Sequence, residues 1–388
     1  MENRKITIVG CGLIGGSIAL ALRQSQSGDT IVCIDLPECL PAIRATGVAD
    51  EIGTPDDLEK HAPESSIVFL AVPVQTAVDV LARLGPFLRE GTIVTDVGST
   101  KKFIMAQAQS LVPTGVHFIG GHPMAGSESS GIEAADPLLF SDRVYVLCPY
   151  PDTPPEALLS LMDLLEKLLA LPVTIEAEEH DRIMAVISHL PQLIAVALMH
   201  AAQLEDAGHG MLDKLAGRGF LDMTRLAASD YGIWKGILET NRDAIEEALK
   251  RFDESLAWLR EAVFDGRATL TWEEAGKRRR KIGSDIPIRL RKPELRTVID
   301  RCDKQIVAAL GHRMQAVRKI GKLKTNQAAP VHDPDRERRM MVQRAEWARA
   351  LGLSQSLVED LFSVILKHST AMQAENGGRT EANPTDSK

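Results

Sequence analysis

Residues 5–15, which read KITIVGCGLIG, decide the fold of this chain. The β-branched run Lys5–Val9 predicts a buried strand, and the apolar pattern of Ile14–Arg23 predicts a helix behind it. Further strands are predicted at Thr30–Ile34, Ile67–Val72, Thr92–Asp96, His117–Gly120, Val144–Cys148 and Val173–Ile175. Helical patterns separate several of these runs, and such alternation is typical of a doubly wound α/β sheet.

The glycines after the first strand have the G-x-G-x-x-G spacing of a dinucleotide-binding turn. Gly10 allows the tight turn, Gly12 lets the backbone approach a pyrophosphate, and Gly15 lets the helix pack closely on the strand. Leu13 and Ile14 begin the helix, whose unpaired N–H groups and dipole favour a bound phosphate. We therefore expect a Rossmann-type dinucleotide-binding domain.

The second predicted strand is followed by Asp35, which lies 20 residues after Gly15. A carboxylate at this place accepts hydrogen bonds from the adenosine ribose and repels a 2′-phosphate, so we expect NAD rather than NADP. A structural turn without a ligand is the alternative. The strand, the helix and the acidic residue are all in register, which favours the nucleotide site.

Composition excludes several classes of protein. Among the 388 residues, 44% are apolar and 25% are charged, which is typical of a globular protein with two or three domains. The five cysteines are scattered and form no C-x-x-C pair, so we expect no disulfide framework, no metal site and a cytoplasmic location. No stretch approaches the ~20 consecutive apolar residues that span a bilayer, and we expect no membrane partner.

Charge is distributed unevenly along the chain. The net charge is −8, yet residues 286–375 hold 17 Lys and Arg against 10 Asp and Glu. Residues 1–285 hold 26 basic and 41 acidic residues. An acidic body thus carries a basic C-terminal module, whose partner is either nucleic acid or a small anion.

Five segments follow from the patterns. We expect a nucleotide-binding domain at 1–177, a helical domain at 178–275, a charged linker at 276–289, a helical module at 290–375 and a disordered tail at 376–388. In the second segment, Ile183–Leu204 is long, apolar and nearly free of charge. Such a helix has to be buried, either in a core or between subunits.

His122 lies in a glycine-rich stretch that follows a predicted strand. The carboxyl edge of such a sheet is where ligands bind. With a pKa near 6.5, an imidazole there could accept a proton from a hydroxyl as hydride leaves. A purely structural histidine is the alternative.

The surroundings of His122 favour the catalytic interpretation. Residues 120–131, GGHPMAGSESSG, resemble the signature of prephenate dehydrogenases. The resemblance extends over residues 5–270 through Asp96-Val97-Gly98-Ser99-Thr100-Lys101, His180-Asp181, Ser188-His189-Leu190-Pro191 and Asp222-Met223-Thr224-Arg225. It implies oxidative decarboxylation of prephenate to 4-hydroxyphenylpyruvate, with NAD as the hydride acceptor, and a homodimer built by the helical domain.

The resemblance also implies roles for individual residues. His122 would take the proton of the ring hydroxyl, Ser99 would help to hold that hydroxyl, and Arg225 would clamp a substrate carboxylate. His189 and Glu128 would line the site.

Two further positions in the resembling stretches are His180 and Gln192. We expect His180 to cap a helix or to lie at an interface. Gln192 stands where some members of the family have histidine, which leaves the choice between prephenate and arogenate open.

The C-terminal module carries cations on a predicted helix of about thirty residues. Arg296, Arg313 and Lys324 fall near one largely apolar face, where they need an anionic partner unless their stems extend outward. In order along the module are Leu295-Arg296, Ile299-Asp300, Asp303, Arg313-Met314, residues 321–324 (GKLK), residues 330–337 (PVHDPDRE), Ser369 and Gln373. This series resembles the all-helical chorismate mutase family, over essentially all of residues 290–374.

This second resemblance implies a rearrangement of chorismate to prephenate without a nucleophile, metal or cofactor. The pocket residues it implies are Arg296, Arg313, Lys324, Asp333, Arg336, Glu337, Ser369 and Gln373. Arginines would bind carboxylates, and Lys324 and Gln373 would donate to the ether oxygen. An intertwined dimer is implied as well, with Arg296 reaching into the partner's site.

Together the two resemblances predict a bifunctional enzyme of tyrosine biosynthesis, in which one product is the other site's substrate. One rival is an arogenate-using or other NAD(P)-dependent dehydrogenase. A β-hydroxyacid enzyme would be expected to use a lysine on the helical domain as its acid/base, and the His122 loop argues against it. Another rival makes residues 286–375 a regulatory or nucleic-acid-binding module. The alternation of cations with acids and the few aromatic residues disfavour nucleic acid.

Overall fold

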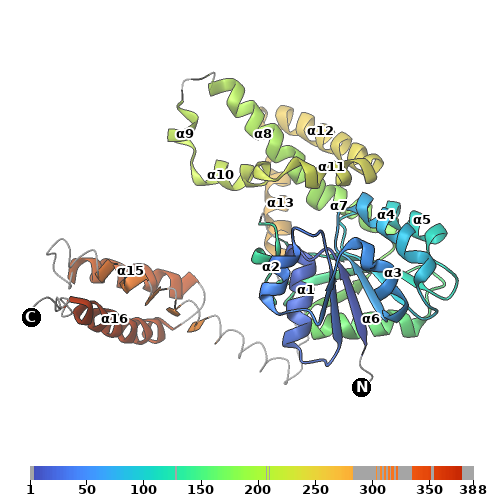
Figure 1. Ribbon diagram of the computed structural model, residues 1–388. Helices are drawn as coiled ribbons and strands as arrows, with labels where there is room; N and C mark the ends of the chain where they lie inside the picture. Colours follow the sequence, from blue (N-terminus) through green and yellow to red (C-terminus); the bar gives the residue numbers. More distant parts are fainter. Residues whose placement is uncertain are drawn as a thin grey trace, which may run out of the picture. The chain divides into compact units, whose positions relative to one another are not determined.

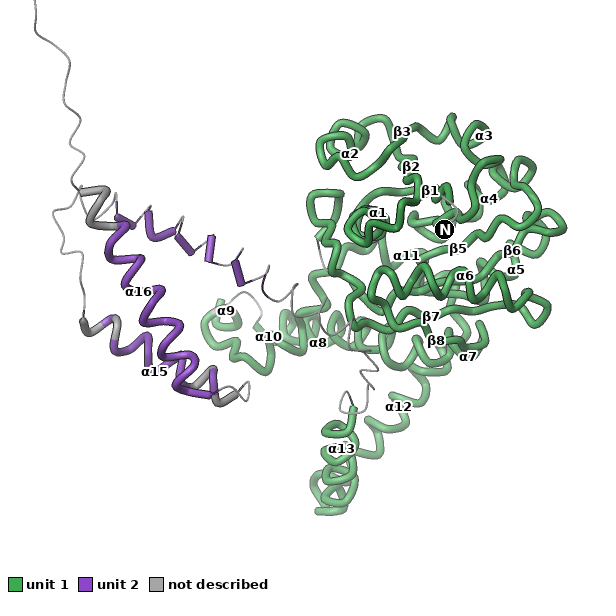
Figure 2. The backbone as a smooth tube through the Cα atoms, turned by 90° about the horizontal axis from the view of Figure 1, so that it is seen from below, with its two compact units in different colours: residues 1–285 green, residues 286–388 purple. Residues whose placement is uncertain are grey.

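The computed structural model describes residues 4–126, 129–206, 208 and 210–282 of the first unit. In the second unit it describes residues 334–350 and 354–377, and a discontinuous set between 303 and 321. The two compact units comprise residues 1–285 and 286–388, which Figure 2 colours separately. Each unit is a compact body of its own.

A sheet forms the centre of the first unit (Figure 1). It has eight strands in the order β3-β2-β1-β4-β5-β6-β7-β8. The strands are β1 Lys5–Val9, β2 Thr30–Ile34, β3 Glu51–Gly53, β4 Ile67–Leu70, β5 Ile93–Asp96, β6 His117–Pro123, β7 Val144–Cys148 and β8 Leu171–Thr174. Every neighbouring pair is parallel except β6 and β7. The predicted Rossmann-type sheet is confirmed. The short strand β3 was not predicted, because three residues show no periodicity.

Helices cover both faces of this sheet (Figure 1). They are α1 Leu13–Gln24, α2 Leu40–Thr46, α3 Leu58–His61, α4 Val74–Leu84, α5 Lys102–Leu111 and α6 Pro155–Lys167. Helices α1, α2 and α6 pack in one apolar layer with Ile6, Ile8 and Phe69. Helices α3, α4 and α5 pack in the other with Val68 and Leu70. Alternate side chains of each strand thus enter opposite layers, which is why the strands read as continuous apolar runs.

The glycine turn fixes how α1 meets β1. Gly10 has a φ of +88°, and its N–H donates to the Ile34 oxygen at 2.8 Å. A Cβ on Gly15 would lie 1.9 Å from the Gly10 oxygen, so only glycine allows this approach of helix to strand. A Cβ on Gly12 would meet nothing within 4 Å. The first and third glycines are therefore required by packing, whereas Gly12 borders open space.

A helical domain follows the sheet. Its long first helix runs from Ala177 to Asp206 and comprises α7 Ala177–Met184, a π-helical turn Ala185–His189 and α8 Leu190–Asp206. The other elements are α9 Leu212–Leu215, α10 Arg218–Thr224, the 3₁₀ turn Arg225–Ala228, α11 Tyr231–Thr240, α12 Arg242–Phe264 and α13 Thr269–Lys281. A small core joins the π-helical turn and α8 to α12 through Ala185, Leu190 and Ile245. Helix α13 includes residues 276–281, which the sequence assigned to a linker.

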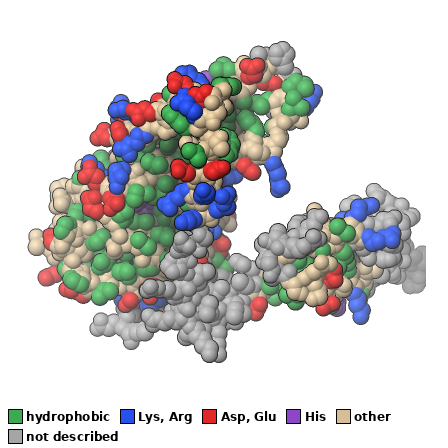
Figure 3. All heavy atoms as spheres, turned by 180° about the vertical axis from the view of Figure 1, so that it is seen from behind, with side chains coloured by type: hydrophobic (Ala, Val, Ile, Leu, Met, Phe, Trp, Pro, Cys, Tyr) green, Lys and Arg blue, Asp and Glu red, His purple; other side chains and the backbone are tan. Residues whose placement is uncertain are grey.

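Much of the helical domain's apolar surface lies exposed within one chain. The helix Ala177–Asp206 is long and apolar enough to cross a membrane, yet only 28% of its most apolar stretch is buried. Ile187, Leu204, Ile233 and Phe264 are all more than half exposed. Figure 3 shows exposed hydrophobic side chains among charged ones over this part of the unit. Apolar surface of this extent is typical of a protein interface.

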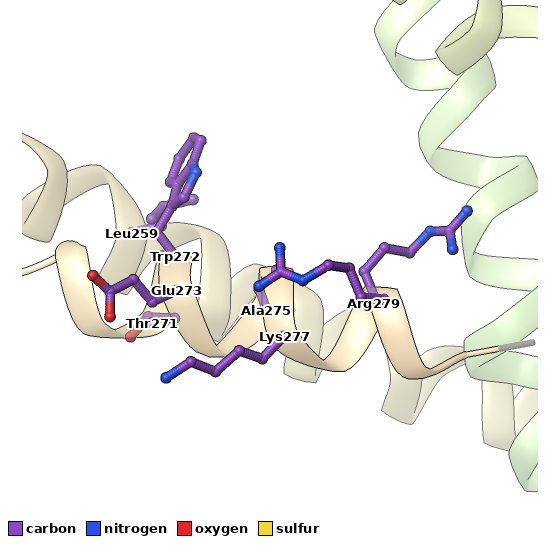
Figure 4. A pocket seen from close by; sticks show the side chains of 9 residues that line it. Leu259, Thr271, Trp272, Glu273, Ala275, Lys277 and Arg279 are labelled. Atoms are coloured by element: carbon purple, nitrogen blue, oxygen red, sulfur yellow. The ribbon is translucent and has the colours of Figure 1, made fainter. Parts of the chain in front are cut away.

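A groove of about 830 Å³ follows α12 and α13. Figure 4 shows side chains that line it, and Trp272, Lys277 and Arg279 project from α13. Neither the glycine turn nor His122 lines this groove.

The described part of the second unit is helical. Helices α15 Pro334–Ala350 and α16 Gln355–Gly377 pack together, with Ala345, Ala348 and Val358 buried. The Arg344 guanidinium lies 4.5 Å from the Phe362 ring centroid, which is a cation–π contact. Most of the long helix predicted before Pro330 lies outside the described residues.

We predict that Gly15→Ala destabilises the first unit and Gly12→Ala does not. The added methyl at Gly15 overlaps the Gly10 oxygen, and such overpacking costs about 1–3 kcal/mol. The methyl at Gly12 enters open space. Thermal unfolding without nucleotide checks this, and equal melting temperatures for the two variants would contradict the packing argument.

Candidate active site

The nucleotide turn lies where the strand order reverses, between β1 and β4. Ligands of doubly wound sheets bind at this crevice, outside the carboxyl ends of the strands. Gly12 is the N-cap of α1 and provides no capping side chain, and no acidic side chain stands in the first turn. Leu13 and Ile14 therefore present N–H groups at a helix end that is electrostatically suited to a pyrophosphate.

Asp35 is fixed beside this turn. Its Oδ2 accepts from the Cys11 N–H at 2.6 Å, and its Oδ1 accepts from the Leu36 N–H at 2.7 Å. The half-buried carboxylate thus stands at the end of β2 next to the glycines, as the sequence predicts. Asp35 thus lies beside the glycine turn, with open space at Gly12, and this arrangement fits an NAD molecule.

A buried ion pair supports the loop that carries His122. Asp96 ends β5, and its carboxylate accepts from Lys101 Nζ and from the Gly121 N–H, the latter at 3.1 Å. Lys101 Nζ also donates to the Gly121 oxygen at 2.5 Å. Asp96 and Lys101 are buried almost completely. Both backbone polar groups of Gly121 are therefore held by charged side chains, one residue before His122.

His122 contacts a second histidine. Its Nδ1 lies 2.9 Å from Nε2 of His180, and the two rings meet edge to face at 76°. Nδ1 of His180 lies 2.8 Å from Oδ1 of Asp181. All three side chains are buried. The expectation that His180 caps a helix or lies at an interface is wrong, because the residue lies inside α7 against His122.

Burial lowers the pKa of His122 well below its usual 6.5, and the neighbouring Lys101, His180 and His189 side chains lower it further. Transfer of an imidazolium into a low-dielectric site is costly, so the neutral form is favoured. At neutral pH this side chain is therefore a proton acceptor.

His189 lies in the same buried region. Its Nδ1 is 3.2 Å from the Asn241 amide nitrogen, which also donates to the Asp181 backbone oxygen at 2.8 Å. The His189 ring meets Trp234 edge to face, with 6.0 Å between centroids. Burial lowers the pKa of His189 to about 4, so it too is neutral. The π-helical turn that ends at His189 is a local irregularity often found at functional sites.

Two of the remaining predicted site residues of this unit, Ser99 and Arg225, are less buried than His122. Ser99 is half-buried in the loop between Asp96 and Lys101. Arg225 is exposed at the start of the 3₁₀ turn, which contacts α8 through a 2.9 Å hydrogen bond from Gln192 Nε2 to the Leu226 oxygen. Glu128 lies outside the described residues.

Sequence reasoning did not single out Asp96, Lys101, Asp181 and Asn241 as individual site residues. The first three belong to the stretches that resemble the family, which was the available signal. The importance of Asp96, Lys101 and Asp181 comes from the nearly complete burial of their charges. That burial follows from packing between segments that are distant in the sequence.

The second unit brings two of its predicted residues together. Nη1 of Arg313 donates to Oγ of Ser369 at 2.5 Å, and Ser369 is buried. Burial lowers the pKa of Arg344, which was not predicted, and the nearby charge of Arg313 lowers it further. Arg336 is exposed on α15. Arg296, Lys324 and Asp333, and the side chains of Glu337 and Gln373, lie outside the described residues.

Domain families match three segments of the chain. Residues 18–173 match "Prephenate dehydrogenase, nucleotide-binding domain", and residues 176–272 match "Prephenate dehydrogenase, dimerization domain". Residues 295–374 match "Chorismate mutase type II".

Known proteins agree with these matches. Prephenate dehydrogenase of Bacillus subtilis is 38% identical over 265 residues, which cover 67% of this chain and 69% of the relative. The solved structure of Aquifex aeolicus prephenate dehydrogenase with hydroxyphenyl propionate and NAD⁺ is 30% identical, with a TM-score of 0.68. The alignment covers 73% of this chain and 99% of that one.

One relative of the C-terminal module is named as a lyase and not as a mutase. Isochorismate pyruvate lyase of Pseudomonas aeruginosa is 40% identical over 80 residues, which cover 21% of this chain and 78% of the relative. The sequence and the fold together place the chain in the prephenate dehydrogenase family, with a type II chorismate mutase domain at its C-terminus.

Proposed function

We propose that this chain catalyses two consecutive steps of tyrosine biosynthesis. The C-terminal domain rearranges chorismate to prephenate, and the first unit converts prephenate to 4-hydroxyphenylpyruvate with NAD. The carrying observation is the buried, neutral His122 held by His180, in a chain that also has a mutase domain.

The dehydrogenase reaction needs a base for one hydroxyl proton. Bound NAD supplies the hydride acceptor. His122 Nε2 accepts the proton of the C4 hydroxyl while hydride leaves C4, and the C1 carboxylate departs as CO₂ with its bonding electrons left in the ring. The ring becomes aromatic and its oxygen regains the proton from His122, which gives the phenol of 4-hydroxyphenylpyruvate. Aromatisation makes the step strongly downhill. General-base catalysis of this kind contributes about 10²–10⁴-fold to the rate.

Other residues of the first unit would bind the substrate. Ser99 follows β5 in the loop that Asp96 and Lys101 support, and it would help to hold the C4 hydroxyl. Arg225 would pair with a carboxylate, for which its guanidinium fork is suited. His189 and Glu128 would line the site. Gln192 leaves open whether arogenate is also accepted.

The mutase reaction is unimolecular, so its pocket has to fold the substrate and stabilise charge on the breaking ether bond. Arg313, oriented by Ser369, would bind a carboxylate. The proposed partners in this pocket are Arg296, Lys324, Asp333, Arg336, Glu337 and Gln373. Lys324 and Gln373 would donate to the ether oxygen.

A lyase is the second candidate for this domain. The observation that favours it is the 40% identity to a protein named isochorismate pyruvate lyase. A pocket that folds the enolpyruvyl arm of one cyclohexadiene could equally hold the isomeric ring. Release of pyruvate from isochorismate distinguishes the two candidates.

The helical domain is proposed to join two copies of the chain into a homodimer. Support comes from its exposed apolar surface and its match to a dimerization domain. We propose domains at 1–177, 178–275 and 290–375, a linker at 276–289 and a tail at 376–388. A cytoplasmic location agrees with the free cysteines among the described residues, and no nucleic acid or membrane partner is proposed.

We predict that His122→Asn abolishes NADH formation from prephenate, by about 10²–10⁴-fold in kcat, because the base is lost. Loss of chorismate by the same variant should be unchanged, since the mutase pocket is separate. Parallel absorbance assays of both reactions check this. A simultaneous fall of both activities would contradict two separate sites.

Arg313→Ala should have the reciprocal effect. Truncation removes a carboxylate partner and leaves Ser369 without its guanidinium, so chorismate loss should fall by at least about 10²-fold, as for other groups that stabilise a transition state. NADH formation from added prephenate should remain. In the wild type, pyruvate release from isochorismate faster than prephenate formation from chorismate would replace mutase by lyase.

The acid limb of kcat/KM for prephenate should lie well below pH 6.5. Only the neutral imidazole of His122 accepts a proton, and a lowered pKa keeps it neutral until the pH falls through that lowered value. Initial rates at saturating NAD, measured over a pH series, locate this limb. A limb at or above pH 6.5 would show that His122 is not the titrating base.

A further inference from the structure

We propose that His180 and Asp181 are positioning residues for the dehydrogenation. They hold the His122 imidazole in the tautomer whose Nε2 lone pair faces the substrate hydroxyl. This inference rests on the proposed dehydrogenase activity and adds the two residues that act through its base.

Asp181 determines which ring nitrogen of His180 carries the hydrogen. Its carboxylate accepts from the Lys101 N–H at 2.7 Å and from the Lys102 N–H at 2.9 Å, at the start of α5. Its third contact is Nδ1 of His180 at 2.8 Å. A carboxylate that already accepts two N–H bonds is an acceptor, so Nδ1 of His180 has to carry the hydrogen.

The tautomer of His180 then determines that of His122. A hydrogen on Nδ1 leaves Nε2 of an uncharged imidazole with a lone pair, and the proposal assigns this form to His180. That lone pair lies 2.9 Å from Nδ1 of His122, which therefore has to be the donor. Nε2 of His122 is left with its lone pair, and it is the nitrogen that can accept a proton from substrate.

The same contacts fix the position of the ring as well as its hydrogen. His180 is buried inside α7, and α5 and α7 pack together with Asp181 bonded across them. Lys101 continues into this network, because its side chain holds Gly121 while its backbone N–H binds Asp181. The charged and titratable groups that face His122 are thus Lys101 from the start of α5, His180 and Asp181 from α7, and His189 from the π-helical turn.

Two substitutions of His180 separate this role from a structural one. In His180→Gln, the amide oxygen can accept from Nδ1 of His122, whereas His180→Leu offers no acceptor. We expect His180→Leu to lower kcat for prephenate by at least about 10²-fold, as removal of the orienting partner of a catalytic histidine does. His180→Gln should stay within about tenfold of the wild type, and the KM values for prephenate and NAD should change by less than about threefold in both variants.

A pH profile gives the second measurement. His180 is the group that faces Nδ1 of His122 and it shifts the pKa of that ring, so His180→Leu should move the acid limb of kcat/KM. His180→Gln should keep the limb in place. A loss of folded protein would reduce kcat without moving the acid limb. Asp181→Asn, which cannot accept all three N–H groups, should also reduce kcat.

Full-length protein provides the controls. Chorismate consumption and the melting temperature of each variant report whether it is folded. His117→Gln is the matched control, because it changes a histidine at the opposite end of β6 and should leave kcat unchanged. Wild-type kcat in His180→Leu, or equal losses in both His180 variants with an unmoved acid limb, would overturn the proposal. A wild type that forms no NADH from prephenate would instead overturn the proposed function.

Discussion

The ion pair between Asp96 and Lys101 is the interaction on which the catalytic geometry of the first unit depends. It joins the end of β5, the start of α5 and Gly121 of β6 at one buried point. Loss of one member of such a pair leaves an uncompensated buried charge, which costs about 3–5 kcal/mol. The pair therefore ties the position of His122 to the stability of the sheet edge.

Burial has a second consequence at this edge. Three histidines, a lysine and two aspartates share a region from which water is largely excluded. The cation of Lys101 is compensated by Asp96, and Asp181 is compensated by N–H donors, so His122 and His189, whose pKa values are lowered by burial, remain neutral. A dehydrogenase that removes a hydroxyl proton requires this protonation state. The same arrangement that stabilises the loop thus keeps His122 in the form that its proposed role as base requires.

Local patterns predicted most of the fold. The strands of the sheet are continuous β-branched runs, and the glycine spacing follows from steric contacts within a few residues, such as that of Gly15 with Gly10. The short strand β3 was missed because its pairing with β2, and not its own sequence, makes it a strand. Of the site, Asp35 and His122 could be proposed because each lies within two residues of the end of a predicted strand. His180 was misassigned because its partner is 58 residues away.

The sequence by itself determined the Rossmann-type sheet, the preference for NAD and the family, because periodicity and motif spacing are local properties that survive without coordinates. The tertiary structure alone decided how His122 is oriented and why it is neutral. Those properties depend on hydrogen bonds and burial among β6, α5 and α7, which come together only when the sheet edge and the long apolar helix pack.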